Sequence, residues 1–228
     1  MLRYVDGHAN SQYEDELRAL ISTLGEMRSL VMEQFALLLA LLDVREKGED
    51  NPKGQAREID KEINALQEQL DKAVLDLLVR HSPQLVELRF TLSASKLAGQ
   101  FERMGDHCKN SIKRVWRAQD KISEELHQNL VGLAAAAAPV LEALEDALLH
   151  FDDAKAIAAL EADDVVDKAY KKLVIKMPKV MDDDDVENEA ISDVLFIGKN
   201  LERIADHATD IIRELYYVHH GKRMEFTE

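Results

Sequence analysis

The chain of 228 residues has little of what most other fold classes need. It contains one cysteine, four prolines and nine glycines, and aromatic residues make up 5% of it. A single cysteine, Cys108, excludes an internal disulfide framework and is typical of a reducing compartment. The chain also lacks the runs of β-branched residues that strands prefer. It is rich instead in Ala, Leu, Glu and Lys, so the composition predicts an all-α protein.

Long apolar runs are missing too. The longest, Phe35–Leu42 and Leu130–Val140, are well short of the roughly 20 residues that cross a bilayer. The first eight residues are polar and carry no apolar core of a signal peptide. We therefore expect a cytoplasmic protein with no direct membrane insertion.

Positive charge is scarce, with 29 basic against 44 acidic residues and a formal net charge of −15. Such a chain repels nucleic acid unless a local basic patch attracts it. The best candidate patch is Lys109, Lys113, Arg114 and Arg117. These residues spread over a broad helix face that we interpret as solvated, so we expect no nucleic-acid partner.

Apolar residues recur three and four positions apart along most of the chain, which predicts six long helices. Pro178 is expected to end the fifth helix and Pro139 to kink the fourth, because proline removes a backbone donor. The acidic run Asp182–Asp185 is interpreted as a solvated loop before the last helix. The expected helices span residues 13–47, 55–80, 83–119, 123–151, 153–177 and 184–219, with breaks at Gly48–Gly54 and Ser82-Pro83.

Two short segments, residues 101–107 and 201–207, repeat one signature. They read Phe-Glu-Arg-Met-Gly-Asp-His and Leu-Glu-Arg-Ile-Ala-Asp-His, with Glu, Arg, Asp and His at positions one hundred residues apart. A weaker match relates residues 58–64 to residues 161–167 in the second helix of each half. The repeats predict a tandem duplication of two three-helix bundles, at residues 1–120 and 121–228.

Each signature places its Glu and Asp four residues apart, on one face of a helix. The second helix of each half carries oxygen-bearing side chains at the same spacing. If these helices pack side by side, the side chains converge, and clustered oxygens suit Mg²⁺, Ca²⁺, Mn²⁺ or iron. We name two predicted sites: the first carboxylate edge is Asp60, Asn64, Glu102 and Asp106, and the second carboxylate edge is Asp163, Asp167, Glu202 and Asp206, with Asp210 one turn further along.

A solvated acidic face is the alternative, since any one Glu and Asp pair among 44 acidic residues carries no information alone. Recurrence in both halves favours the cation sites, and the neutral amide of Asn64 makes the first edge the weaker one. Arg103 and Arg203 are expected to form ion pairs across the bundle.

His107 and His207 point about 100° away from the neighbouring aspartates, so packing or capping is favoured over ligation, although ligation stays open. The Glu124-x-x-His127 spacing of di-iron bundles occurs once, and we interpret it as coincidence.

The second signature and the segment Glu58–Leu66 resemble the helix motifs of the PhoU family, bacterial accessory proteins of phosphate transport and phosphate signalling. The likeness extends from about Tyr13 to Met224. Phe101 and Met104 depart from the Leu and Ile more frequent in the family, and both are apolar exchanges that alter packing and not chemistry.

The resemblance implies two similar three-helix bundles with multinuclear metal, iron or zinc in some relatives, on the carboxylate edges. It implies a negative regulator of phosphate uptake and of the phosphate-starvation response, whose partners are a phosphate ABC transporter ATPase subunit and a membrane sensor histidine kinase. We also expect a homodimer.

No segment indicates a nucleophile, so we expect no catalysis. The metal, if bound, is a divalent or multinuclear cofactor that could be Fe, Zn, Mn or Mg. Two alternatives stay open: a metal-dependent enzyme or iron-handling protein, and a helical adaptor in which the acids only keep the surface soluble.

Overall fold

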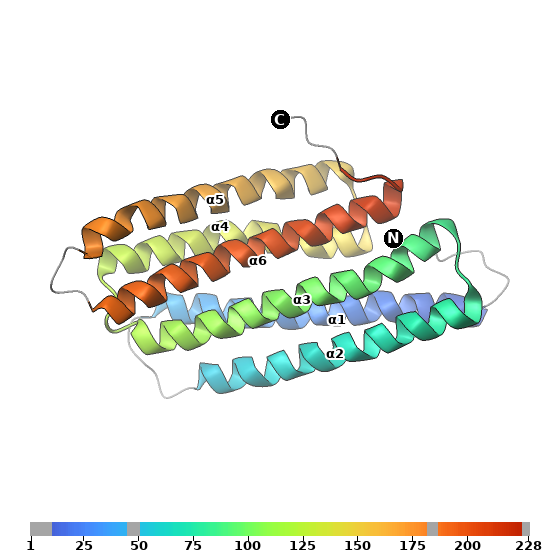
Figure 1. The fold of residues 1–228 in the computed structure, drawn as a ribbon, viewed down its shortest axis with the longest axis horizontal. Helices are drawn as coiled ribbons and strands as arrows, with labels where there is room; N and C mark the ends of the chain where they lie inside the picture. Colours follow the sequence, from blue (N-terminus) through green and yellow to red (C-terminus); the bar gives the residue numbers. More distant parts are fainter. Residues whose placement is uncertain (1–10, 45–50, 182–186, 225–228) are drawn as a thin grey trace.

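The computed structural model describes residues 11–44, 51–181 and 187–224, and these form six long α-helices without a strand (Figure 1). The chain is therefore all-α, as its composition predicts. The helices are α1 (Ser11–Asp43), α2 (Pro52–His81), α3 (Leu85–Ala118), α4 (Glu124–Leu149), α5 (Asp153–Met181) and α6 (Asn188–His220).

Polar caps set several helix ends. Before α2, the Asn51 side chain accepts the Gly54 backbone N–H at 3.1 Å, and Pro52 follows in the first turn, where its missing donor costs nothing. The helix ends where Ser82 turns to a left-handed conformation (φ 48°). The expected break at Ser82-Pro83 is confirmed.

The prediction that Pro178 ends the fifth helix is wrong, because α5 continues to Met181. Pro178 lies on the exposed side of α5, one turn from its end. Water can satisfy the carbonyl that loses its partner there, so the proline is tolerated. Pro139 likewise lies within α4. The acidic run Asp182–Asp185 and residues 48–50 of the first break lie outside the described residues.

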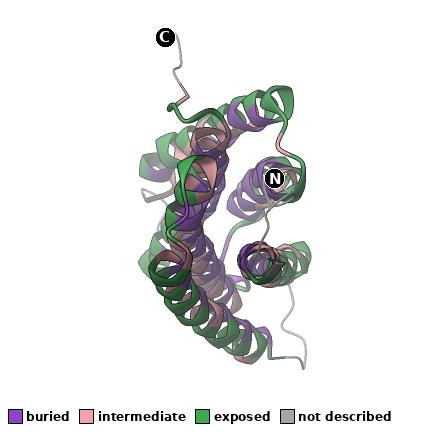
Figure 2. Ribbon diagram, turned by 90° about the vertical axis from the view of Figure 1, so that its right-hand side faces the viewer, coloured by how far each residue is buried: buried purple, intermediate pink, exposed green. Residues whose placement is uncertain are grey.

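Helices α1, α2 and α3 form one three-helix bundle, and α4, α5 and α6 form the other (Figure 1). A curved row of four helices, in the order α5, α6, α3, α2, packs over α1 and α4, and the buried residues line the space between these two layers (Figure 2). One continuous apolar core runs through both bundles. The tandem duplication is thus present, while the domain limits 1–120 and 121–228 stay a prediction.

Two glycines mark close approaches of the signature helices to their neighbours. A Cβ at Gly105 on α3 would lie 2.8 Å from Cδ1 of Ile63 on α2, and a Cβ at Gly198 on α6 would collide with Leu173 on α5. Small residues here let the second and third helices of each half approach, which brings the carboxylate edges together. No helix in the described part of the chain is long and apolar enough to cross a membrane.

Candidate functional site: the α3–α6 seam and the two carboxylate edges

Helices α3 and α6 run antiparallel and join the two halves along a seam. At its centre His107 and His207 stack with ring centroids 5.4 Å apart and planes 14° apart. Asn200 Oδ1 lies 3.2 Å from His107 Nδ1, and Gln100 Oε1 lies 2.7 Å from His207 Nδ1. Each half thus offers the same histidine and a carboxamide to the other, and both histidines serve as packing residues of the seam.

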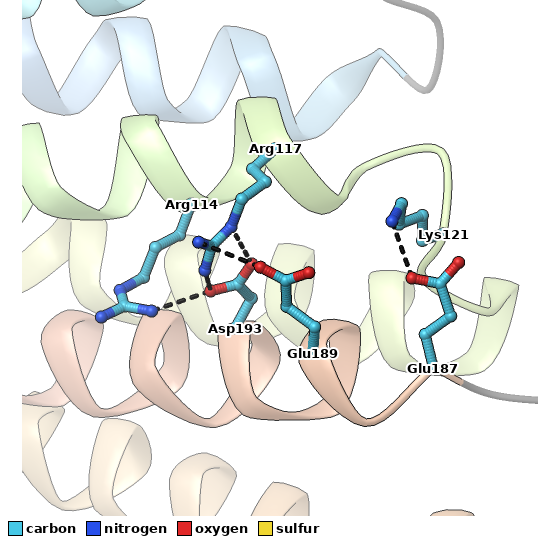
Figure 3. Close-up of polar contacts among 6 residues, drawn as sticks. All are labelled: Arg114, Arg117, Lys121, Glu187, Glu189 and Asp193. Atoms are coloured by element: carbon cyan, nitrogen blue, oxygen red, sulfur yellow. Dashed lines mark hydrogen bonds and ion pairs between the residues drawn. The ribbon is translucent and has the colours of Figure 1, made fainter.

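Towards the C-terminal end of α3 and the N-terminal end of α6, charged residues pair across the seam. Arg114 Nη1 donates to Asp193 Oδ1 at 2.8 Å, and Arg117 Nε donates to Asp193 Oδ2 at 2.8 Å (Figure 3). Asp193 is 0% exposed, so its carboxylate depends entirely on these two guanidinium groups. Arg117 also pairs with Glu189 at 3.2 Å, and Lys121 pairs with Glu187 at 2.7 Å near the start of α6 (Figure 3).

The opposite end of the seam carries the duplicated positions with different residues. Ser93 occupies the place of Asp193, and its hydroxyl donates to Glu214 Oε1 at 2.6 Å. Lys96 pairs with the same carboxylate at 3.0 Å. Both ends are satisfied, but only the Asp193 end buries a full charge.

The interpretation of the basic residues of α3 as a solvated face is wrong for Lys109 and Arg114, which are partly buried, whereas Arg117 is exposed as expected but also pairs with Asp193. Arg114 and Arg117 hold Asp193, and Lys109 holds the first carboxylate edge. The sequence showed these cations but not the acids of other helices that face them. Conversely, Arg103 and Arg203 are exposed and form no ion pair with any acid in the described ranges, contrary to expectation.

At the first carboxylate edge the ammonium of Lys109 bridges carboxylates of two helices. Its Nζ lies 2.8 Å from Asp60 Oδ2 on α2 and 2.7 Å from Asp106 Oδ1 on α3. Asn110 also donates to Asp106 Oδ2 at 3.0 Å. Burial raises the pKa of Glu102, and the nearby carboxylates of Asp106 and Asp60 raise it further.

The structure thus brings Asp60, Glu102 and Asp106 together, as predicted. Asn64 is half-buried and makes no hydrogen bond to these three groups within the described chain. Lys109 was assigned to the solvated face, although its position three residues after Asp106 on a helix indicates an ion pair with that aspartate.

At the second carboxylate edge the lysine ion pairs each lie within one helix: Lys171 with Asp167 at 3.7 Å on α5, and Lys199 with Glu202 on α6. Burial raises the pKa of Asp163 to about 6, and repulsion from Asp206 and Asp167 adds to it. Burial also raises the pKa of Asp206, with Glu202 as the next cause. These mutual effects show that acids of α5 and α6 converge as predicted and repel one another.

Three basic residues pair with acids of this edge, and Arg213 and Lys199 also partly offset the rise in the pKa of Asp163 and of Asp206. Lys199 Nζ donates to Glu202 Oε1 at 2.6 Å, and Arg213 pairs with Asp210 at 3.1 Å. Thr209 stands at the position that Lys109 has in the first half, and its hydroxyl donates to the Asp206 backbone carbonyl at 2.8 Å. Asp163 and Asp206 form no ion pair within the described residues, and the pKa of each stays raised.

The donor sets differ in how well they fit a metal. Across the described residues, no three His, Cys, Asp or Glu side chains are already arranged as a metal site. The first edge is neutralised by Lys109 and fits a cation poorly. The second edge, with repelling carboxylates from two helices, has the chemistry that a hard cation requires. Metal at either edge stays a prediction.

His127 and Cys108, also considered above, are core residues. His127 is 5% exposed, at the start of α4. Cys108 is buried, and burial raises the pKa of its thiol.

The fold and the seam define a class: an internally duplicated pair of three-helix bundles with an acidic edge in each half. The family model of the PhoU domain matches this chain twice, at residues 24–115 and 130–215. The chain belongs to the PhoU family.

Named relatives agree along nearly the whole chain. A phosphate-specific transport system accessory protein PhoU homolog of Zymomonas mobilis is 30% identical over 218 residues, 94% of this chain and 92% of that protein. PhoU homolog 1 of Thermotoga maritima is 26% identical over 217 residues, 93% of this chain and 91% of that protein.

Solved structures match the fold. The crystal structure of PhoU from Pseudomonas aeruginosa superposes with a TM-score of 0.85 at 26% identity, covering 92% of this chain and 100% of that one. The phosphate transport system regulatory protein PhoU from Streptococcus pneumoniae gives a TM-score of 0.79 at 26% identity, covering 94% and 100%.

Proposed function

We propose that this chain is a cytoplasmic, non-catalytic negative regulator of phosphate uptake and phosphate-starvation signalling. It links the ATPase subunit of a phosphate ABC transporter to a membrane sensor histidine kinase, holding the kinase in its phosphatase-biased state when phosphate is plentiful. The observation that carries the proposal is the family match in both halves, together with full-length similarity to phosphate transport accessory proteins.

The architecture supports a binding role. Long helices present extended surfaces, and exposed apolar side chains on α2, α3 and α5 are available for a partner protein; they include Leu75, Val79, Leu92, Val165 and Ile175. A second copy of the chain is the homodimer partner that we propose for one such face.

The direct test is binding. The purified chain is mixed with the transporter ATPase subunit and, separately, with the kinase cytoplasmic region from the same genome, and complexes are measured by light scattering. In cells, deletion of the chain should raise expression of a phosphate-starvation reporter in high phosphate, and the intact gene should restore repression. A deletion strain with normal repression would overturn the proposal.

We also propose that the second carboxylate edge binds a divalent or multinuclear metal through Asp163, Asp167, Glu202 and Asp206, with Asp210 at its margin. The support is the raised pKa of Asp163 and of Asp206, to which repulsion among these carboxylates adds after burial. The cation would neutralise that repulsion and tie α5 to α6, so its contribution is structural. The first edge would bind metal only after Lys109 moves away from Asp60 and Asp106.

Elemental analysis of wild type and of Glu202→Gln/Asp206→Asn tests the metal. Fe, Zn, Mn and Mg are supplied in turn, and we expect stoichiometric metal in the wild type and loss of it in the double variant. Equal metal in both proteins would contradict this assignment. The same preparations, assayed on a phosphate ester and on ferrous iron, should show no turnover; activity that vanishes in Asp206→Asn would favour an enzyme or iron-handling protein.

A further inference from the structure

A cavity of about 670 Å³ opens between α3, α6 and the residues that follow α6. Four cationic side chains line it: Lys96 and Arg103 from α3, Arg213 from α6, and Arg223 beyond α6. Such a concentration stands out in a chain with a net charge of −15.

The acids of the cavity do not cancel this charge. Asp210 and Glu214 line it as well, and each already pairs with one cation, Arg213 at 3.1 Å and Lys96 at 3.0 Å. Arg103 and Arg223 form no ion pair with any acid of the described ranges. Two guanidinium groups therefore remain as surplus positive charge at one cavity.

The neutral lining adds a donor and an apolar wall. Gln100 Oε1 accepts a hydrogen bond from His207 Nδ1 at 2.7 Å, so the amide N–H groups of Gln100 stay available for a ligand. Tyr217 is half-buried, and its ring lines the cavity with Leu97 and Met224. Flat aromatic and aliphatic surface beside cations suits an organic group attached to an anion.

We propose that this cavity binds a phosphate group carried by a small organic molecule. Arg103 and Arg223 bind the phosphate, since a guanidinium donates two parallel hydrogen bonds to phosphate oxygens. Gln100 adds a neutral donor, and Tyr217 contacts the organic part. The volume lies in the range of small-molecule sites, roughly 300–1,000 Å³, and exceeds what free phosphate fills. The inference stands on this geometry and does not depend on the proposed function.

The duplication supplies a matched control. Arg203 occupies the same signature position as Arg103 and is equally exposed on the surface, but it does not line the cavity. Replacing either arginine removes one charge from the same motif. Only Arg103→Gln should affect a ligand in the cavity, whereas general attraction of anions would respond to both changes.

The test is calorimetric titration of the full chain with AMP, adenosine and inorganic phosphate as probes. We expect AMP to bind, adenosine not to bind and inorganic phosphate to bind more weakly than AMP. Arg103→Gln and Arg223→Gln should each weaken AMP binding by about tenfold or more, the effect of losing a charge-assisted hydrogen bond. Arg203→Gln should change it less than about twofold, within the scatter of a remote charge.

Tyr217→Leu separates the two parts of the ligand. It should weaken AMP and leave inorganic phosphate unchanged, with far-UV circular dichroism confirming that each variant is folded. Absence of AMP binding at millimolar concentration would overturn the proposal, as would equal losses in Arg103→Gln and Arg203→Gln. If inorganic phosphate binds as tightly as AMP, the proposal that the cavity also contacts an organic group is wrong. Since no transporter or kinase is present, these outcomes are independent of the regulatory test.

Discussion

The two halves of the molecule carry the same signature and use it differently. In the first half, Lys109 bridges Asp60 and Asp106 and completes the carboxylate edge with an ammonium group. In the second half Thr209 stands in that place, and burial, with repulsion from Asp206 and Asp167, raises the pKa of Asp163 to about 6. At this position one half has a lysine that bridges two helices and the other half has a threonine; binding of an external cation at the second edge stays a prediction.

The seam shows a second contrast of the same kind. Asp193 is buried with two arginines, whereas Ser93 at the duplicated position makes a hydrogen bond to Glu214. After duplication, each copy kept the backbone geometry while its polar groups found different partners. A repeated motif therefore predicts where side chains lie but not which groups they pair with.

The largest expected effect is at the charged end of the seam. Arg114→Gln together with Arg117→Gln leaves the Asp193 carboxylate buried without a counter-charge, which should lower the free energy of unfolding by about 3–5 kcal/mol. Urea unfolding measures it. Lys96→Gln at the other end removes a largely exposed partner of Glu214 and should cost less than about 1 kcal/mol. Equal costs at both ends would remove the contrast.

Next in size is the removal of the internal cation of the first half. Lys109→Met leaves the carboxylate of Asp60, which is only 9% accessible to solvent, without a counter-charge. The free energy of unfolding of the metal-free protein should therefore fall by about 1–3 kcal/mol. Added Mn²⁺ should restore part of this loss, because the first edge then resembles the second. Melting temperatures with EDTA and with Mn²⁺ measure both effects, and Lys199→Met is the control in the second half. If Mn²⁺ does not raise the melting temperature of Lys109→Met, the lysine does not substitute for a metal.

A smaller effect is expected at the matched aspartates Asp106 and Asp206, where the same substitution should change the free energy of unfolding in opposite directions. Asp106→Asn removes a partner of Lys109 and should destabilise the metal-free protein by about 0.5–1 kcal/mol. Asp206→Asn removes a source of repulsion from Asp163 and should stabilise it by a similar or smaller amount, roughly 0.5 kcal/mol. Urea unfolding in EDTA at neutral pH compares them. The same sign in both would contradict the different electrostatics of the two edges.

The smallest expected effect lies at the end of α6, where His219 stands at the position of Gln119 in α3. Burial lowers the pKa of His219 to about 4, with His220 adding to it, and its ring stacks on Phe151 with centroids 4.7 Å apart. The unfolded histidine titrates near 6.5. Between about pH 6.5 and 4 the unfolded chain binds a proton that the native one does not, so stability falls as pH falls.

His219→Gln gives the second half the residue of the first and should remove this part of the pH dependence. The change in unfolding free energy between pH 7 and pH 5 should shrink by a few tenths of a kcal/mol, up to about 1, since the side chain is half exposed. Urea titrations at the two pH values compare variant and wild type. An unchanged slope would mean that His219 is protonated equally in both states.

Much of the fold was predictable because its causes are local and periodic. Heptad-like spacing of apolar residues, a proline after Ser82 and a duplicated signature specify six helices in two bundles. The prediction that Pro178 ends the fifth helix was wrong because residue type alone does not show that this proline lies on the exposed side of α5 near its end. There water replaces the lost hydrogen bond. The stacking of His107 on His207 could not be predicted from the sequence either, since these residues meet only when the two halves pack together.

The sequence by itself determined the helices, the duplication and the faces on which the acids lie, because each depends on residue spacing within one helix. Only the tertiary structure decided which charges meet: Lys109 with Asp60 of α2, Arg114 and Arg117 with Asp193 of α6, and Arg103 with Arg223 at one cavity. The physical reason is that electrostatic energy depends on the distance between atoms and on their burial. Residues far apart in the chain acquire both only when α2, α3 and α6 pack together.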